Sequence, residues 1–224
     1  MKNILFLLCF MIISSYVLNA QDYTKAEDSD PQAKAILDGL RSKYKSYNNV
    51  EANFTLELEI PGQPKEIQKG EVYRQGDKYN FNIAGRKFIS DGKTIWIILD
   101  QNQEVQISDV PEEEADEGIL SPQSLFTFYE SGDFVYYLFN EVSQSGAIVQ
   151  QIEFKPLDEY ADYSKLRMEI NKSKKEIMNV KAFGKDGSRY TFKIGAIKTA
   201  TNLAASLFTF DKVKYKDYTI VDLR

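Results

Sequence analysis

The chain has 224 residues, a length that suits one domain or at most two. It has one cysteine and no histidine, so it lacks the usual general base near neutral pH and the commonest metal ligand. Its 33 acidic residues outnumber its 28 basic ones, and this balance argues against nucleic acid as a partner.

The first 20 residues have the pattern of a secretory signal peptide: Lys2, an apolar run from Ile4 to Val17, and then the small Ala20. We expect cleavage after Ala20; the alternative is a buried core helix. Cleavage would remove Lys2 and leave 27 basic against 33 acidic residues, a net charge of −6. Cys9 follows two leucines rather than the small residue of a lipid-anchored signal, so we expect a mature chain without cysteine or lipid anchor.

Residues 21–30 are polar and acidic and are expected to form a loose N-terminal segment, followed by a single domain over residues 31–224. Asp30 and Pro31 are the residue types of a helix N-cap and first turn. The side chains that follow at helical spacing predict a helix with one apolar face: Ile36, Leu37, Leu40, Tyr44 and Tyr47.

Most of the remaining chain alternates between apolar and polar residues in short segments separated by turns, as in Phe54 to Ile60, Tyr79 to Ile83 and Leu166 to Ile170. An unbroken series of short strands predicts an antiparallel meander. Two helical interruptions are expected. One begins at Ser121-Pro122, and the other is a short turn over residues 201–207; residues 134–142 favour a strand.

The segment "FISDGKTIW" at residues 88–96 ends like a phosphate-binding loop. Such a loop needs a glycine five positions before Gly92, where this chain has Lys87, and it needs a helix after it rather than a strand-forming run. Asp91-Gly92 instead predicts a two-residue type I′ hairpin turn, in which both residues have positive φ.

Acidic residues are numerous but do not define a catalytic or metal site. The segment "PEEEADEG" at residues 111–118 is interpreted as a solvated loop, because its spacing matches no calcium loop. A glycosidase would need a marked carboxylate pair, and no serine lies in a nucleophile-elbow motif. We therefore expect no enzyme activity, metal or cofactor.

The segment Thr94 to Leu99 is apolar on both faces, which a half-solvated antiparallel strand does not require. One explanation is burial beneath a second protein layer. The other is a curved sheet that holds an apolar ligand, with helices across the mouth.

The order of the segments resembles the LolA-type periplasmic lipoprotein carriers of Gram-negative envelopes. The resemblance covers residues 32–224, through "VEANFTLEL", "GEVYRQGDKYNF", "FISDGKTIWIILDQNQEVQI", "SPQSLF", "QQIEFKP", "KDGSRYTFKI" and "LFTFDKVKYKDYTIVDLR". It implies an α+β fold: an antiparallel, unclosed half β-barrel with helices covering a concave apolar cavity for acyl chains.

The resemblance implies a monomeric periplasmic carrier without catalysis. Its cargo would be acylated lipoproteins, supplied by an inner-membrane ABC-type transporter and passed to an outer-membrane receptor where one is present. Arg74 would bond helix backbone and hold the lid closed, although Gln75 replaces a proline common in the family. The alternative is a lipid- or lipoprotein-sensing regulatory module. Candidate cavity residues are Phe54, Leu56, Leu58, Phe81, Ile83, Phe88, Trp96, Ile98, Leu125, Phe126, Met168 and Phe192.

Overall fold

The computed structural model describes residues 25–110, 128–199 and 202–224. In these ranges the structure contains one α-helix, α1 (Pro31–Lys45), and 3-10 turns η1 (Ala26–Asp28), η3 (Phe128–Glu130) and η4 (Ala205–Phe208). The strands are β1 (Asn49–Glu59), β2 (Glu66–Gln75), β3 (Lys78–Ile83), β4 (Arg86–Ser90), β5 (Thr94–Leu99), β6 (Glu104–Asp109), β7 (Phe134–Gln144), β8 (Ala147–Pro156), β9 (Tyr163–Asn171), β10 (Glu176–Gly184), β11 (Arg189–Lys198) and β12 (Thr219–Asp222).

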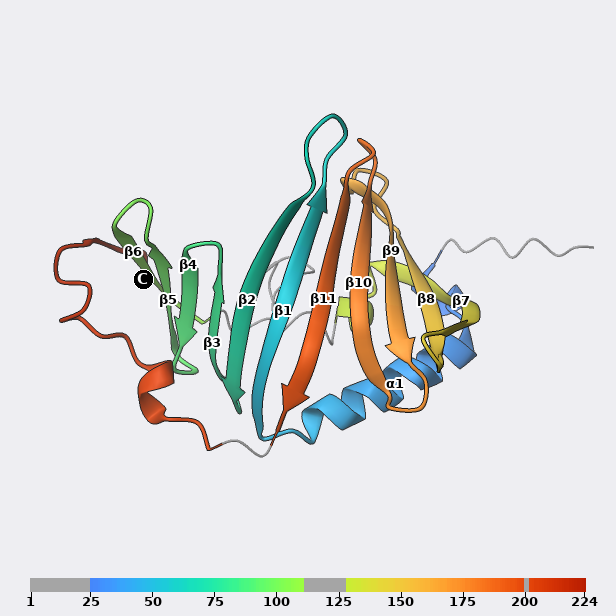
Figure 1. Ribbon diagram of the computed structural model, residues 1–224, viewed down its shortest axis with the longest axis horizontal. Coiled ribbons are helices and arrows are strands. Elements are labelled where there is room, and N and C mark those ends of the chain that lie inside the picture. Colours follow the sequence, from blue (N-terminus) through green and yellow to red (C-terminus); the bar gives the residue numbers. More distant parts are fainter. Residues whose placement is uncertain (1–24, 111–127, 200–201) are drawn as a thin grey trace, which may run out of the picture.

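All of these strands belong to one sheet in the order β12-β6-β5-β4-β3-β2-β1-β11-β10-β9-β8-β7. The predicted meander is present as two antiparallel runs, β1 to β6 and β7 to β11, joined where Leu56 of β1 pairs with Phe192 of β11. Strand β12 pairs with β6 in parallel. The sheet is therefore unclosed and mostly antiparallel, with α1 crossing behind the lower ends of β10, β9 and β8 in Figure 1.

Helix α1 begins where the sequence predicted. The Asp30 carboxylate accepts a hydrogen bond from Gln32 N at 2.8 Å, and Pro31 occupies the first turn. The helix ends at Lys45, earlier than the two asparagines expected to stop it. Its buried residues are Ala33, Leu37, Leu40 and Tyr44, so the helix has one apolar face. No helix in the described part of the chain is long and apolar enough to span a membrane.

Each face of the sheet contributes to a different hydrophobic cluster. We call the face covered by α1 the helix face; its core includes Leu37, Phe54, Ile152, Met168 and Phe192. The opposite face, here the outer face, has a smaller cluster on β4 to β6, where Tyr215 of the C-terminal segment packs with Ile89, Ile98, Val105 and Ile107. Side chains alternate between these faces along each strand.

The turn at Asp91 differs from the predicted type I′ turn. Strand β4 ends at Ser90 and β5 begins at Thr94, so the loop has three residues. Gly92 has φ of 91°, but Asp91 is not among the residues with positive φ. The reason is local: the Asp91 carboxylate accepts hydrogen bonds from Lys93 N and Thr94 N, both at 2.9 Å, and thereby closes the turn.

Two further predicted elements are present in the structure. Residues 134–142 lie within strand β7, and the helical turn expected near residues 201–207 is represented by η4, which begins at Ala205. The signal segment, the acidic loop at 111–118 and the helix expected from Pro122 lie outside the described residues.

Candidate functional site

The N-terminal end of α1 is attached to β7, the outermost strand of its run. Asp30 N donates to the carbonyl of Tyr136 at 2.9 Å, and Leu138 N donates to the Asp30 carboxylate at 3.0 Å. Tyr136 N donates to the hydroxyl of Ser29 at 3.2 Å. These bonds fix the start of the helix and occupy backbone groups that an edge strand would otherwise leave unpaired.

The C-terminal end of α1 is attached to β10 and the turn before it. The buried hydroxyl of Tyr44 accepts a hydrogen bond from Ile177 N at 3.0 Å. Lys43 Nζ donates to the carbonyl of Lys174 at 2.6 Å and to the Glu176 carboxylate at 3.0 Å. Burial raises the pKa of Tyr44 to about 12, so its hydroxyl stays neutral near neutral pH.

Arg74 connects this end of the helix to strand β2. Its Nη2 atom donates to the carbonyl of Tyr44 at 3.1 Å and to that of Tyr47 at 3.0 Å. The last carbonyls of a helix lack intrahelical partners and attract a cation. Desolvation by burial lowers the pKa of Arg74, yet a guanidinium keeps its charge in proteins. The contact with helix backbone that the resemblance implies is present; the lid-holding role stays a prediction.

Beneath and beside α1, aromatic rings form a continuous row on the helix face. The ring of Phe54 stacks on Phe192 with centroids 4.8 Å apart and on Phe81 at 4.9 Å. Phe81 in turn contacts Phe88 at 5.7 Å. The row runs from β11 through β1 and β3 to β4, so it includes strands of both antiparallel runs.

The structure brings together half of the predicted cavity residues. Six of them belong to the core cluster beneath α1 or pack against it: Phe54, Phe81, Ile83, Phe88, Met168 and Phe192. Leu56 and Leu58 are partly buried on β1 but are members of neither cluster. Leu125 and Phe126 lie outside the described residues. The structure shows that these six residues pack in the core. Contact between them and a ligand stays a prediction.

Trp96 and Ile98 lie with the outer-face cluster instead. The Trp96 ring stacks on Phe210 with centroids 5.9 Å apart, and Ile98 is 0% exposed. Asn80 Nδ2 also donates to the carbonyl of Leu207 at 2.6 Å, which fixes η4 against the same face. The C-terminal segment covers the outer face of β5, which explains in part why both faces of this strand are apolar. This agrees with the first explanation given for Thr94 to Leu99, burial beneath a second protein layer.

Sequence reasoning missed Phe134 and Phe154 as members of the helix-face core. Phe154 is visible in the alternation of its strand, whereas Phe134 stands at a strand start without a strong local signal. It also missed three buried polar atoms without a hydrogen-bond partner in the described residues, the Tyr129 hydroxyl and Arg41 Nε near α1 and the Thr191 hydroxyl on β11. Burial raises the pKa of Tyr129, so this hydroxyl is neutral.

Apolar side chains make up most of the helix face. The described residues contain no group of three or more Asp, Glu, His or Cys side chains that could hold a metal ion. What the helix face provides is aromatic and branched side chains under a helix attached at both ends. Such a surface suits an apolar ligand that offers few hydrogen bonds.

In the part of the chain that the structure describes, one α-helix lies against an unclosed, mostly antiparallel sheet, and comparison with known families agrees with this fold. The family model described as "Outer membrane lipoprotein carrier protein LolA" matches residues 46–211. The chain therefore belongs to the LolA family. No match to a curated protein was found.

Among solved structures, an uncharacterized conserved protein from Thermus thermophilus supports the fold. It aligns with a TM-score of 0.57 at 15% identity, covering 85% of this chain and 99% of that one. Two others are more distantly similar. LprF from Mycobacterium bovis aligns at 0.47 and 13% identity, covering 78% and 96%. A LolA superfamily protein from Nitrosomonas europaea aligns at 0.42 and 13% identity, covering 80% and 97%.

Proposed function

We propose that this protein is a soluble periplasmic carrier that takes up the acyl chains of lipoproteins and moves them from the inner to the outer membrane. The observation that carries the proposal is the aromatic row of the helix face beside a helix held by a few polar contacts at its ends. Family membership supports it, and so does the pattern of a signal peptide at residues 1–20.

The physics of the cargo explains why a carrier needs such a surface. Transfer of acyl chains out of an apolar environment costs about 0.8 kcal/mol per CH₂, so an acylated protein does not cross an aqueous compartment unaided. The row of phenylalanines can bury chains without specific hydrogen bonds, which suits cargo of variable conformation. The cargo must also be released, and release requires a state with lower affinity.

Movement of α1 relative to the sheet would supply that state. Arg74 is the residue we assign to holding this helix down, because its guanidinium joins strand β2 to the carbonyls at the end of α1. With Arg74 bonded, the helix face under α1 is closed. With the bond broken, the helix can separate from β2 and open the surface between them.

The proposed cycle needs two partners. An inner-membrane ABC-type transporter would supply the lipoprotein, and an outer-membrane receptor, where present, would accept it. The carrier itself would act as a monomer without cofactor or catalysis. The candidate acyl contacts are the six residues of the helix face named above together with Leu56 and Leu58 of β1.

The experiment that tests the proposal is release of newly made lipoproteins from spheroplasts by the purified protein. We expect labelled lipoprotein in the soluble fraction, bound to the carrier, and native mass spectrometry of that fraction should show one acylated polypeptide on the protein. Failure to release lipoproteins would contradict the carrier proposal. Recovery of a signalling protein instead of lipoproteins from the periplasm would favour a lipid-sensing regulatory module.

A further inference from the structure

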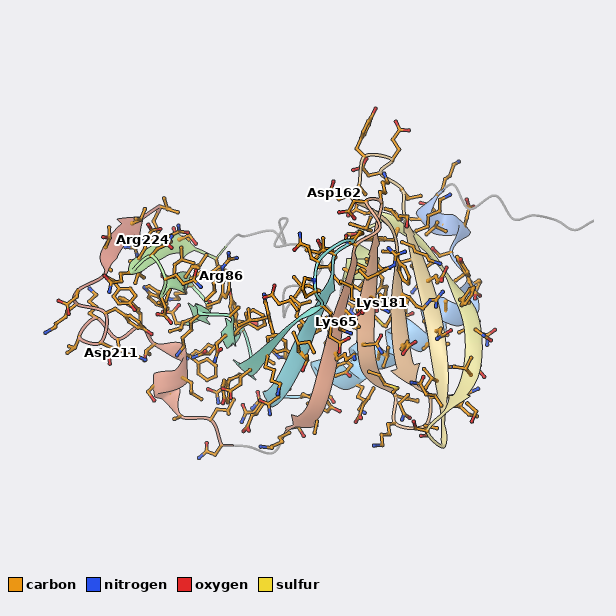
Figure 2. The ribbon with its side chains drawn as sticks, turned by 45° about the horizontal axis from the view of Figure 1, so that its top comes forward. Lys65, Arg86, Asp162, Lys181, Asp211 and Arg224 are labelled. Atoms are coloured by element: carbon orange, nitrogen blue, oxygen red, sulfur yellow. The ribbon has the colours of Figure 1, made fainter. Side chains whose placement is uncertain are left out.

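The outer face of β8 to β11 carries a group of cations that the helix-face function does not use. Lys165 and Arg167 lie on β9, Lys181 on β10 and Arg189 on β11, and we call these four residues the cationic face. The strand neighbours of the first three cations are core residues beneath α1, namely Leu166, Met168, Val180 and Ala182, and Tyr190 next to Arg189 packs against the same core. Because side chains alternate along a strand, the four cations point away from the helix, and Figure 2 shows Lys181 on the strand face opposite α1.

Aromatic rings hold these cations in place. The Phe183 ring has Arg189 Cζ at 4.9 Å, Lys165 Nζ at 5.1 Å and Arg167 Cζ at 5.6 Å from its centroid. Arg167 also lies 4.6 Å from the centroid of Phe139, which is 47% exposed. A guanidinium stacked on a ring loses less freedom when it later binds an anion, because its position is already set.

The register of the sheet places like charges together on the cationic face. Lys181 pairs directly with Arg167 across β9 and β10, and Phe183 pairs with Lys165 on one side and Arg189 on the other. Like charges directly opposite each other destabilise a sheet. Local arrangements that oppose stability are expected where a function requires them.

Carboxylates balance these charges only in part. Glu153 is 3% exposed and forms ion pairs with both Lys165 and Arg167. For Lys181 and Arg189, no ion pair with a carboxylate is present among the residues the structure describes. Glu59 pairs with Arg189 across β1 and β11, but its carboxylate forms an ion pair with Lys65 instead. Glu169, also on this face of β9, accepts hydrogen bonds from Gln151 and Asn179. Lys181 and Arg189 therefore remain available to an anion from outside.

We propose that the cationic face is a docking surface for an acidic segment of a partner protein. The guanidinium of Arg189, stacked on Phe183, can bind a carboxylate through paired hydrogen bonds, and Lys181 adds a second positive charge on the same face. Arginine and aromatic side chains are also the types enriched at protein interfaces. The net charge of the whole chain is −5, so an anionic bilayer would repel the rest of the molecule, whereas a peptide segment contacts only this face.

The test uses a synthetic peptide of consecutive glutamates as the probe and the full secreted chain as the protein. Titration followed by amide NMR should perturb Arg167, Lys181, Phe183 and Arg189, and binding should weaken as salt rises. The double variant Lys181→Glu with Arg189→Glu should bind at least tenfold more weakly. The neutral variant Lys181→Gln with Arg189→Gln should show an intermediate loss, and thermal unfolding of both verifies that they fold.

The control is Lys212→Glu with Lys216→Glu, two exposed lysines of the C-terminal segment that change the net charge by the same amount. This control should bind the peptide as the unaltered protein does. The proposal is overturned if the charge-reversed variant binds the peptide as tightly as the unaltered protein. It is also overturned if the peptide changes amide chemical shifts only in other strands. It is also overturned if anionic phosphatidylglycerol vesicles bind through this face while the peptide does not, or if charge reversal abolishes a dimer seen by size exclusion.

Discussion

The ring of Phe54 occupies the space that a side chain at position 70 would fill. Phe54 of β1 pairs directly with Gly70 of β2, and a Cβ atom built on Gly70 would overlap both the Phe54 ring and the carbonyl oxygen of Asn82. The missing side chain lets Phe54 lie flat between Phe81 and Phe192. The aromatic row of the helix face therefore depends on one glycine in a neighbouring strand.

Gly70→Ala should destabilise the protein more than an ordinary glycine replacement in a strand. The overlap with the Asn82 carbonyl involves backbone, so side-chain rotation alone cannot relieve it. Overpacking of this kind costs about 1–3 kcal/mol, and we expect a loss in the upper part of that range from urea unfolding. Displacement of Phe54 should also reduce binding of an acylated ligand.

Gly39→Ala is the matched control, because it makes the same chemical change in α1 with no atom within 4 Å of the new Cβ. Alanine in a helix interior is favoured over glycine by about 1 kcal/mol. We expect this variant to be more stable than the unaltered protein. Equal effects of the two substitutions would contradict the packing argument for Gly70.

A second prediction concerns Glu153, the carboxylate beneath the cationic face. Burial acts to raise its pKa, but hydrogen bonds from Lys165, Arg167 and Tyr137 outweigh burial, and the net result is a lowered pKa. A carboxyl with a lower pKa in the folded state stabilises the fold above its unfolded pKa of about 4.3. That stabilisation is lost as pH falls below this value through the folded pKa.

Glu153→Gln should therefore remove part of the acid sensitivity of unfolding. At pH 7 we expect a loss of about 1–3 kcal/mol, since charge-assisted hydrogen bonds are replaced by weaker ones. Below about pH 4.3 the difference from the unaltered protein should shrink. Urea unfolding at a series of pH values measures both effects, and the exposed Glu159→Gln is the control. A constant difference at every pH would show that Glu153 acts through packing rather than charge.

The sequence predicted the elements better than their assembly. Residue types near Asp30 determine where α1 begins, because an N-cap acts within one turn, and period-two alternation reveals strands such as β3 and β9. The pairing of β1 with β11 and the parallel β12 depend on contacts between distant segments. No local pattern encodes such contacts, so the row of rings across β11, β1 and β3 was not foreseen.

For the candidate site, too, the sequence predicted local features but not contacts between distant segments. Apolar alternation placed Phe54, Phe81 and Phe192 on strands, where they were candidate cavity residues, and the fold brings their rings into contact. The same pattern could not assign Trp96, because both faces of β5 are apolar and the covering residue, Phe210, lies far along the chain. The sequence also did not predict that Gly70 makes room for the Phe54 ring, since no local pattern links a glycine in β2 to a ring in β1.

Trp96 is the only tryptophan in the chain, which makes its fluorescence a test of which face binds cargo. Its ring stacks on Phe210 on the outer face, whereas Phe88 lies in the row of the helix face. We expect a triacylated lipopeptide to leave the emission maximum of Trp96 unchanged. In the double variant Trp96→Phe with Phe88→Trp, the same ligand should shift emission to shorter wavelength. A shift from Trp96 alone would place the ligand under the C-terminal segment.

The last prediction concerns Arg74, whose replacement by leucine should impair cargo transfer more than it lowers stability. The change removes two charge-assisted hydrogen bonds to the carbonyls of Tyr44 and Tyr47. Water can reach part of this site, because Arg74 is only half-buried, so we expect a loss of about 2 kcal/mol or less in urea unfolding. Loss of these two hydrogen bonds also favours the state in which α1 is released from β2. Each 1.4 kcal/mol by which that state is favoured corresponds to about a tenfold decrease in cargo affinity.

Transfer of a labelled lipoprotein to acceptor membranes, measured beside hydrogen exchange of the amides at the end of α1, separates the two effects. Arg74→Leu should accelerate exchange near Tyr44 and retain less cargo, while Arg224→Leu, at an exposed position after β12, should change neither. If exchange accelerates but cargo retention equals that of the unaltered protein, Arg74 stabilises the helix end without controlling the site. If neither changes, these two hydrogen bonds do not determine the position of the helix, and α1 is held by its apolar face and by Asp30.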